Sequence, residues 1–175
     1  MFKPTMMIDQ ILDIDPQEFL DRGITVILSD LDNTLVPWNE RQRRDQKLLN
    51  WTQALVDKQI QLVVASNNSQ ERVEKAVAGL HVTVLARAHK PLPFVIQKFL
   101  RQQQWSSKEV VFVGDQVLTD VLAGNLAHLQ TILVRPLVAT DAKKTRINRF
   151  FERPLMWWNQ KFDSQLRWRQ HLDDK

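Results

Sequence analysis

Short runs of hydrophobic residues alternate along the chain with longer amphipathic stretches. Five of these runs are rich in Val, Ile and Leu, as expected of strands buried on both faces of a parallel sheet. They cover Ile24 to Ser29, Gln61 to Ala65, Val82 to Leu85, Val110 to Val113 and Thr131 to Val134. Such an alternation is typical of helices packed on both faces of a sheet. The pattern therefore predicts a three-layer, Rossmann-like α/β fold with a five-stranded, mainly parallel sheet.

Capping residues predict where the helices between these strands begin and end. The segment Asp15 to Glu18 offers an N-cap, a proline in the first turn and a capping-box glutamate, and Gly23 marks the end of that helix. The segment Asn68 to Glu71 repeats this pattern before a second helix, which Gly79 ends. Two further helices are predicted at Pro93 to Gln104 and Leu118 to Leu126.

The bulk composition is that of a folded globular protein. The 175 residues fit one domain, and 43% of them are hydrophobic and 25% charged. The absence of cysteine excludes disulfides, thiolate zinc sites and a cysteine nucleophile, so any metal needs oxygen or imidazole ligands. Acidic residues interrupt the apolar stretches near the N-terminus, and no run approaches the roughly 20 apolar residues of a membrane span. We expect a cytoplasmic protein.

Positive charge is concentrated near the C-terminus. The chain carries a net charge of +4, but residues 143–169 alone carry eight basic and two acidic residues. Large apolar residues recur there at helical spacing: Ile147, Phe150, Phe151, Leu155, Trp158, Phe162 and Leu166. We expect a core at 1–142 and a basic, amphipathic helical tail at 143–175. The apolar face either packs on the core or contacts an anionic partner, a membrane surface or RNA.

Acidic side chains follow two of the predicted strands directly. Asp30 and Asp32 come after the first strand, and Asp115 comes after the fourth. In open α/β sheets, ligands bind outside the carboxyl ends of the strands, near the point where the strand order reverses. Carboxylates gathered in one crevice repel one another unless a cation lies between them, and an all-oxygen site suits magnesium. The sequence therefore predicts a Mg2+ site.

Two more polar segments, Ser66-Asn67 and Lys90-Pro91, follow the second and third strands. Taken one at a time, such residues are more often helix caps or solvated loop residues, and the histidines of the chain are best interpreted as surface or packing residues. Together with the acids they supply a nucleophile, a proton donor and a cation. Phosphoryl transfer requires these three groups.

The order of these segments resembles the four motifs of the haloacid dehalogenase (HAD) superfamily phosphatases. They are Asp30-Leu31-Asp32-Asn33-Thr34, Ser66-Asn67, Lys90-Pro91 and Gly114-Asp115-Gln116-Val117-Leu118-Thr119-Asp120. The sequence around these motifs, over roughly residues 5 to 150, is similar to the YqeG-like branch of class IIIA. Some relatives of this branch, in fungal mitochondria, dephosphorylate phosphatidylglycerophosphate, so the resemblance implies a phospholipid phosphate as a candidate substrate.

The resemblance also implies the role of each motif residue. Asp30 would be the nucleophile that forms an aspartyl-phosphate, and Asp32 would protonate the leaving group and then activate water. Ser66 would hydrogen-bond the phosphoryl group, and Lys90 would neutralise its growing charge. The implied substrate-binding residues are Asn33, Ser66, Asn67 and Lys90.

The metal site is implied in the same way. Mg2+ would be held by the carboxylates of Asp30 and Asp115 and by the backbone carbonyl of Asp32. Asp120 is a supporting residue, which either reaches the metal through water or orients the lysine of the third motif.

The spacing of the motifs leaves no room for a cap domain. Only 33 residues separate Asp32 from Ser66, and 23 separate Ser66 from Lys90. We therefore expect a capless fold with an open site, which favours a large substrate such as a phosphorylated macromolecule or a lipid head group. The alternative is a HAD-fold binding protein that acts on RNA or ribosomes through its basic tail.

Overall fold

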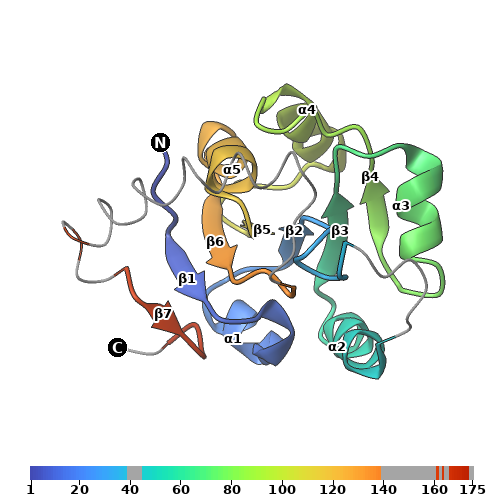
Figure 1. The fold of residues 1–175 in the computed structure, drawn as a ribbon, viewed down its shortest axis with the longest axis horizontal. Helices are drawn as coiled ribbons and strands as arrows, with labels where there is room; N and C mark the ends of the chain where they lie inside the picture. The colour runs from blue at the N-terminus through green and yellow to red at the C-terminus, as the bar shows by residue number, and fades with distance from the viewer. Residues whose placement is uncertain (39–44, 139–160, 162, 164–165, 174–175) are drawn as a thin grey trace.

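The computed structural model describes residues 1–38, 45–138, 161, 163 and 166–173. Its strands form one parallel sheet of seven strands in the order β4-β3-β2-β5-β6-β1-β7 (Figure 1). The strands are β1 (Met6–Ile8), β2 (Val26–Ser29), β3 (Gln61–Ala65), β4 (Thr83–Leu85), β5 (Val110–Gly114), β6 (Gln130–Val134) and β7 (Trp168–Arg169). The α/β class, the parallel sheet and the five expected strands are confirmed.

The prediction of five strands was too low. The two additional strands, β1 and β7, extend the sheet beyond β6 and contain only three and two residues. Runs this short are too brief for a hydrophobic pattern to identify. In addition, β7 lies in the segment whose spacing predicted an amphipathic helix. Its strand conformation comes from pairing with β1.

The helices begin and end largely where the capping residues predicted. They are α1 (Pro16–Asp21), α2 (Gln46–Asp57), α3 (Gln70–Ala76), α4 (Phe94–Gln103) and α5 (Leu122–Leu126), with a short 3-10 helix at Ile11–Asp13. Asp15 and Glu18 form the predicted capping box, and the Ser69 side chain caps α3. Gly23 and Gly79 adopt positive φ angles of 71° and 84° just after α1 and α3. Such backbone favours glycine and ends a helix.

The last predicted helix differs from the expectation. Val117–Val121 forms a π-helical turn that leads into α5. Within this turn the backbone N–H of Val121 donates to the carbonyl of Gln116 at 3.2 Å, one residue further back than in an α-helix. Turns of this kind occur often at functional sites.

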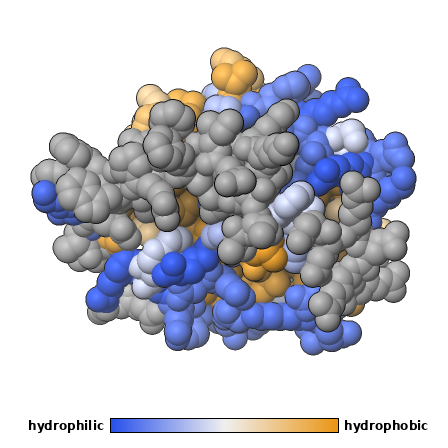
Figure 2. Space-filling model, viewed as in Figure 1, coloured by the Kyte–Doolittle hydropathy of each residue, from blue (hydrophilic) through white to orange (hydrophobic). Residues whose placement is uncertain are grey.

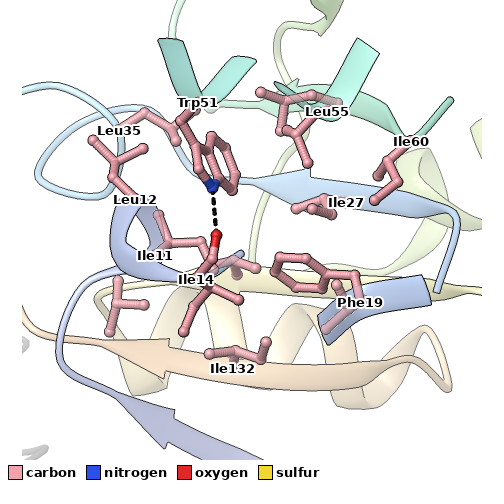
Figure 3. Close-up of a cluster of buried hydrophobic side chains, with 14 of the residues drawn as sticks. Ile11, Leu12, Ile14, Phe19, Ile27, Leu35, Trp51, Leu55, Ile60 and Ile132 are labelled. Atoms are coloured by element: carbon pink, nitrogen blue, oxygen red, sulfur yellow. Dashed lines mark hydrogen bonds between the residues drawn. The ribbon is translucent and has the colours of Figure 1, made fainter. Parts of the chain in front are cut away.

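The sheet is covered on both faces, which makes the three predicted layers. Successive residues of β5 face opposite sides, so Val111 and Val113 pack in one core cluster, while Val110 and Phe112 pack in the other. The first cluster includes buried residues of α1, α2 and α3, and the second includes those of α4 and α5. Figure 3 shows the first cluster, in which the indole N–H of Trp51 donates to the carbonyl of Ile14 at 2.9 Å.

The described end of the C-terminal segment is part of the folded body. Here β7 pairs with β1, and Leu166 and Leu172 are buried at 4% and 1% exposure. Arg22 in the α1 C-cap pairs with Asp173 at 2.7 Å. The expected apolar stripe from Ile147 to Phe162 and the expected boundary at 142 lie outside the described residues. None of the helices in the described part of the chain is long and apolar enough to cross a membrane.

Candidate active site

The order of the strands brings the first and fourth motifs side by side. The chain passes from β2 to β3 and β4 on one side, and then places β5 and β6 on the other side of β2. The order therefore reverses between β2 and β5, which is where open α/β sheets bind ligands. Asp30 follows β2, and its backbone N–H donates to the carbonyl of Val113 at 2.8 Å. Asp115 directly follows β5 at the same sheet edge.

A buried lysine joins two of the acids. The ammonium of Lys90 lies 2.5 Å from Asp30 Oδ1 and 2.7 Å from Asp120 Oδ1. The side chains of Lys90 and Asp120 are only 3% and 1% exposed. Burial by itself lowers the pKa of Lys90, but the carboxylates of Asp120 and Asp30 outweigh it, so the pKa rises above its ordinary value. The ammonium therefore stays charged at neutral pH.

The proton affinity of Asp30 is raised. The pKa of Asp30 rises from 3.8 to about 7, chiefly because the carboxyl group is buried; the positive charge of Lys90 acts against this rise, and the negative charges of Asp120 and Asp32 contribute to it. Lys90 alone thus leaves the negative charge around Asp30 incompletely compensated. An additional cation beside Asp30 would stabilise its ionised form.

Three buried carboxylates could hold such a cation. One oxygen each of Asp30, Asp115 and Asp120 lies within 4.8 Å of the others. The donors are all oxygen, which fits a hard divalent cation such as Mg2+. The structure thus brings together Asp30 and Asp115, as expected, and adds Asp120 to them. The side chain of Asp32 points elsewhere, and its expected contribution to the metal, through the backbone carbonyl, stays a prediction.

Asp120 reaches the cluster because Gly114 lacks a side chain. A Cβ added at Gly114 would lie 2.3 Å from the Asp120 Cβ and 2.4 Å from its Oδ2. The π-helical turn carries Asp120 back over the end of β5, where the N–H of Gln116 donates to Asp120 Oδ2 at 3.1 Å. The glycine before Asp115 is therefore required by a close approach, a signal that the sequence did contain.

The Asp32 side chain lies apart from the ion pairs of Lys90 with Asp30 and Asp120, at the rim of the site beside α3. Its carboxylate accepts from the Asn68 side chain at 2.8 Å and from the Arg72 guanidinium at 3.0 and 3.2 Å. The same Asn68 amide also donates to the hydroxyl of Ser66 at 3.0 Å. Sequence reasoning missed Asn68 and Arg72, because around a capped helix start both resemble ordinary polar residues.

Asn67 holds the backbone of Lys90. Its side-chain oxygen accepts from the Lys90 N–H at 2.7 Å, and its amide donates to the Lys90 carbonyl at 2.9 Å. Both ends of this amide are thus engaged by the protein. The expected substrate-binding role of Asn67 stays a prediction, and these contacts show that its side chain also positions the backbone of Lys90.

Asn33 shapes the turn that follows Asp32. It is buried with a positive φ of 65°, and its N–H donates to the carbonyl of Val36 at 2.6 Å. Its side chain accepts from the N–H of Trp38 at 3.4 Å. Its substrate-binding role stays a prediction, as does that of Ser66, a buried residue at the end of β3 whose hydroxyl accepts from the Asn68 N–H at 3.2 Å.

Comparison with known proteins gives the family of the chain. Residues 87–149 match the model of the HAD-hydrolase-like family. The chain is 34% identical over 155 residues to the probable phosphatase YqeG of Bacillus subtilis, a match that covers 89% of the chain and 90% of that protein. A shorter segment of 45 residues is 51% identical to the ribonucleotide monophosphatase NagD of Escherichia coli, covering 26% of the chain and 18% of that protein.

Solved structures agree in fold. The cobalt-bound deoxy-D-mannose-octulosonate 8-phosphate phosphatase of Haemophilus influenzae matches with a TM-score of 0.54 and 15% identity, over 75% of this chain and 77% of that one. The related phosphatase of Moraxella catarrhalis, solved with magnesium and phosphate, matches with a TM-score of 0.50 and 15% identity over 76% of each chain. At this level of identity the likeness concerns the fold alone.

Proposed function

This chain belongs to the YqeG family of HAD superfamily phosphatases, and we propose that it hydrolyses a phosphate monoester with Mg2+ through an aspartyl-phosphate on Asp30. The observation that carries the proposal is the buried cluster of Asp30, Lys90, Asp115 and Asp120 at the reversal of the strand order. It combines a nucleophile, a fixed positive charge and an all-oxygen metal site within a few ångströms.

In the first step, an Asp30 oxygen attacks phosphorus, and the bond from phosphorus to the ester oxygen breaks. The leaving oxygen takes a proton from Asp32, a role supported by the 30% exposure of its side chain at the rim. In the second step, Asp32 takes a proton from water, which attacks the phosphorus of the aspartyl-phosphate. Inorganic phosphate leaves, and the Asp30 carboxylate is restored.

Lys90 and the metal address the charge that this chemistry develops. The Lys90 ammonium, fixed by Asp120, neutralises the phosphoryl oxygens, while Asn67 holds the backbone of the same lysine. Asp30 and Asp115 would hold Mg2+, with Asp120 beside them and the Asp32 carbonyl as the expected further ligand. When bound, the metal supplies positive charge that lets Asp30 ionise and draws phosphate toward it.

The substrate that we favour is a phospholipid phosphate such as phosphatidylglycerophosphate. Leu92 and Phe94, two and four residues after Lys90, are 53% and 69% exposed. Figure 2 shows hydrophobic residues at the top of the view, over the region of α4. Apolar residues held at the surface so close to a catalytic lysine could contact acyl chains, and a site without a cap leaves room for a membrane-bound head group.

The test is phosphate release by the purified protein, with Mg2+ or with a chelator, from an aryl phosphate and from vesicles that contain phosphatidylglycerophosphate. We expect Mg2+-dependent release that Asp30→Asn abolishes and that Asp57→Asn, an exposed acid on α2, leaves intact. No release from any of these substrates would refute the proposal. Salt-sensitive retention of RNA that is indifferent to Asp30→Asn would favour the binding-protein alternative instead.

A further inference from the structure

We propose that the outer surface of α4 and of the loop before it binds the surface of an anionic lipid bilayer. This surface, called here the α4 face, consists of two apolar residues, Leu92 and Phe94, and three basic residues, Arg87, Lys98 and Arg101. Binding to lipid is a property of the α4 face itself, whereas its use in catalysis rests on the proposed function.

The α4 face exposes two large apolar side chains at the start of the helix. Leu92 is 53% exposed and Phe94 is 69% exposed, whereas Ile96 and Leu100 of the same helix are buried in the core cluster against the sheet. A single exposed leucine would be ordinary. The core contacts of α4 are already made by other residues, so packing of the helix does not account for Phe94.

Basic residues lie on the same side of α4 as Phe94. Lys98 and Arg101 follow Phe94 by four and seven residues, a spacing that places all three on one stripe of a helix, and all three are exposed. Along the helix axis, Lys98 lies about 6 Å and Arg101 about 10 Å from Phe94. Arg87 adds an exposed cation in the loop between β4 and α4.

The surroundings of these cations lack exposed acids. The segment 75–108 contains six Lys and Arg residues and no Asp or Glu. The neighbouring helix α5, whose Leu126 carbonyl accepts from the Gln97 side chain at 3.2 Å, contains none either. In the part of the chain that the structure describes, no carboxylate pairs with the three cations of the α4 face. Such a surface attracts an anionic partner.

The combination of few apolar residues with several cations favours a bilayer as that partner. A stable protein interface buries about 800 Å² on each side, more than two apolar side chains supply. A bilayer needs only a few apolar side chains at the acyl boundary and cations at the level of its anionic head groups. RNA would use the cations and leave Leu92 without a partner, and a second copy of the same face would bring like charges together.

Docking of the α4 face would bring the bilayer to the active site. Leu92 lies two residues after Lys90, and its N–H donates to the carbonyl of His89 at 2.9 Å, so one turn carries both the lysine and an apolar contact. The Lys90 ammonium in turn contacts Asp30. A phosphorylated head group would therefore be presented to the nucleophile from the membrane surface.

The test is co-sedimentation of the full chain with lipid vesicles, without Mg2+ and without a phosphomonoester lipid. We expect binding to vesicles of phosphatidylcholine and phosphatidylglycerol in equal amounts to be at least about tenfold tighter than binding to phosphatidylcholine alone. Lys98→Gln combined with Arg101→Gln should weaken binding to the anionic vesicles by about thirtyfold. Leu92→Ser combined with Phe94→Ser should weaken it by at least about tenfold.

Matched controls lie at the opposite edge of the sheet. Val56 and Lys58 precede β3, and Lys108 precedes β5, so these exposed residues lie at the amino ends of strands whose carboxyl ends form the active site. Val56→Ser removes an exposed apolar side chain, and Lys58→Gln combined with Lys108→Gln removes two exposed cations. These controls should bind vesicles as the wild type does.

Each outcome bears on one proposal or the other. Equal binding to both kinds of vesicle, no binding, or binding that the α4-face variants weaken no more than their controls do would overturn this inference. So would RNA binding or self-association through the α4 face in a chain that does not bind vesicles. Vesicle binding by a chain that hydrolyses no phosphate monoester would overturn the proposed function alone, and hydrolysis without vesicle binding would overturn this inference alone.

Discussion

The contact between Gly114 and Asp120 gives the sharpest test of how the site is assembled. In Gly114→Ala, the new Cβ would lie 2.3 Å from the Cβ of Asp120. Rotation of the carboxylate cannot relieve a clash with Cβ, so either the end of β5 or the π-helical turn must shift. Asp120 would then lose its 2.7 Å contact with Lys90 and its bond from the Gln116 N–H.

The magnitude follows from two terms. Overpacking of a core position costs about 1–3 kcal/mol, and breaking one side of a buried ion pair costs about 3–5 kcal/mol. Because Lys90 keeps Asp30 as a partner, we expect a total loss of about 2–5 kcal/mol in the free energy of unfolding. For a chain of this size each kcal/mol shifts Tm by about 2–4 °C, so Tm should fall by roughly 5–20 °C.

The assay is thermal unfolding together with phosphate release. Gly79→Ala is the matched control, because its Cβ would meet nothing within 4 Å and the cost of its positive φ of 84° is about 1–2 kcal/mol. We also expect Gly114→Ala to lose at least tenfold in kcat, since Lys90 and the metal site lose Asp120. A Tm within about 3 °C of wild type, or one above that of Gly79→Ala, would refute the reasoning.

Three further predictions follow from the same structure. The pKa of Asp30 is about 7 in the folded state against 3.8 in the unfolded state, so protonation of Asp30 favours folding when divalent cations are absent. The free energy of unfolding should therefore fall by up to about 4 kcal/mol between about pH 4 and pH 7. Chemical unfolding should show a weaker pH dependence of stability for Asp30→Asn, and an equal pH dependence would contradict the assignment. Asn67→Ala removes two hydrogen bonds to the Lys90 backbone and should lower kcat by about tenfold to a hundredfold in steady-state assays. An unchanged kcat would exclude the role of Asn67 in positioning Lys90. Leu172→Ala should lower the free energy of unfolding by about 2–4 kcal/mol, because Leu172 is buried, whereas Leu92→Ala at an exposed position should change it by no more than about 0.5 kcal/mol. Equal effects of the two substitutions would argue against a C-terminal segment packed on the core.

The C-terminal segment illustrates where periodicity misleads. Leu166 belonged to a stripe with helical spacing, yet it is buried just before the strand β7. Apolar residues three or four apart satisfy a helix, but pairing with a strand more than 150 residues away can override that local preference. For the residues described here, packing on the core is the alternative that the structure supports.

The sequence by itself determined the elements and the chemistry of this protein. Runs of Val, Ile and Leu specify buried parallel strands, and Asp15 and Ser69 specify helix starts, because these signals act within a few residues. Motif order also pointed to Asp30, Lys90 and Asp115, since strand ends of a parallel sheet share one edge.

Only the tertiary structure decided how these residues are held. Asn67 hydrogen-bonds to Lys90, which lies 23 residues away in the sequence, and Arg72 hydrogen-bonds to Asp32, which lies 40 residues away. Asp120 packs against Gly114 because of a turn whose geometry no local sequence pattern encodes. Contacts of this kind depend on the direction and distance of side chains from separate elements, which are fixed when the layers pack. The composition of the site is therefore a property of the chain, and its arrangement is a property of the fold.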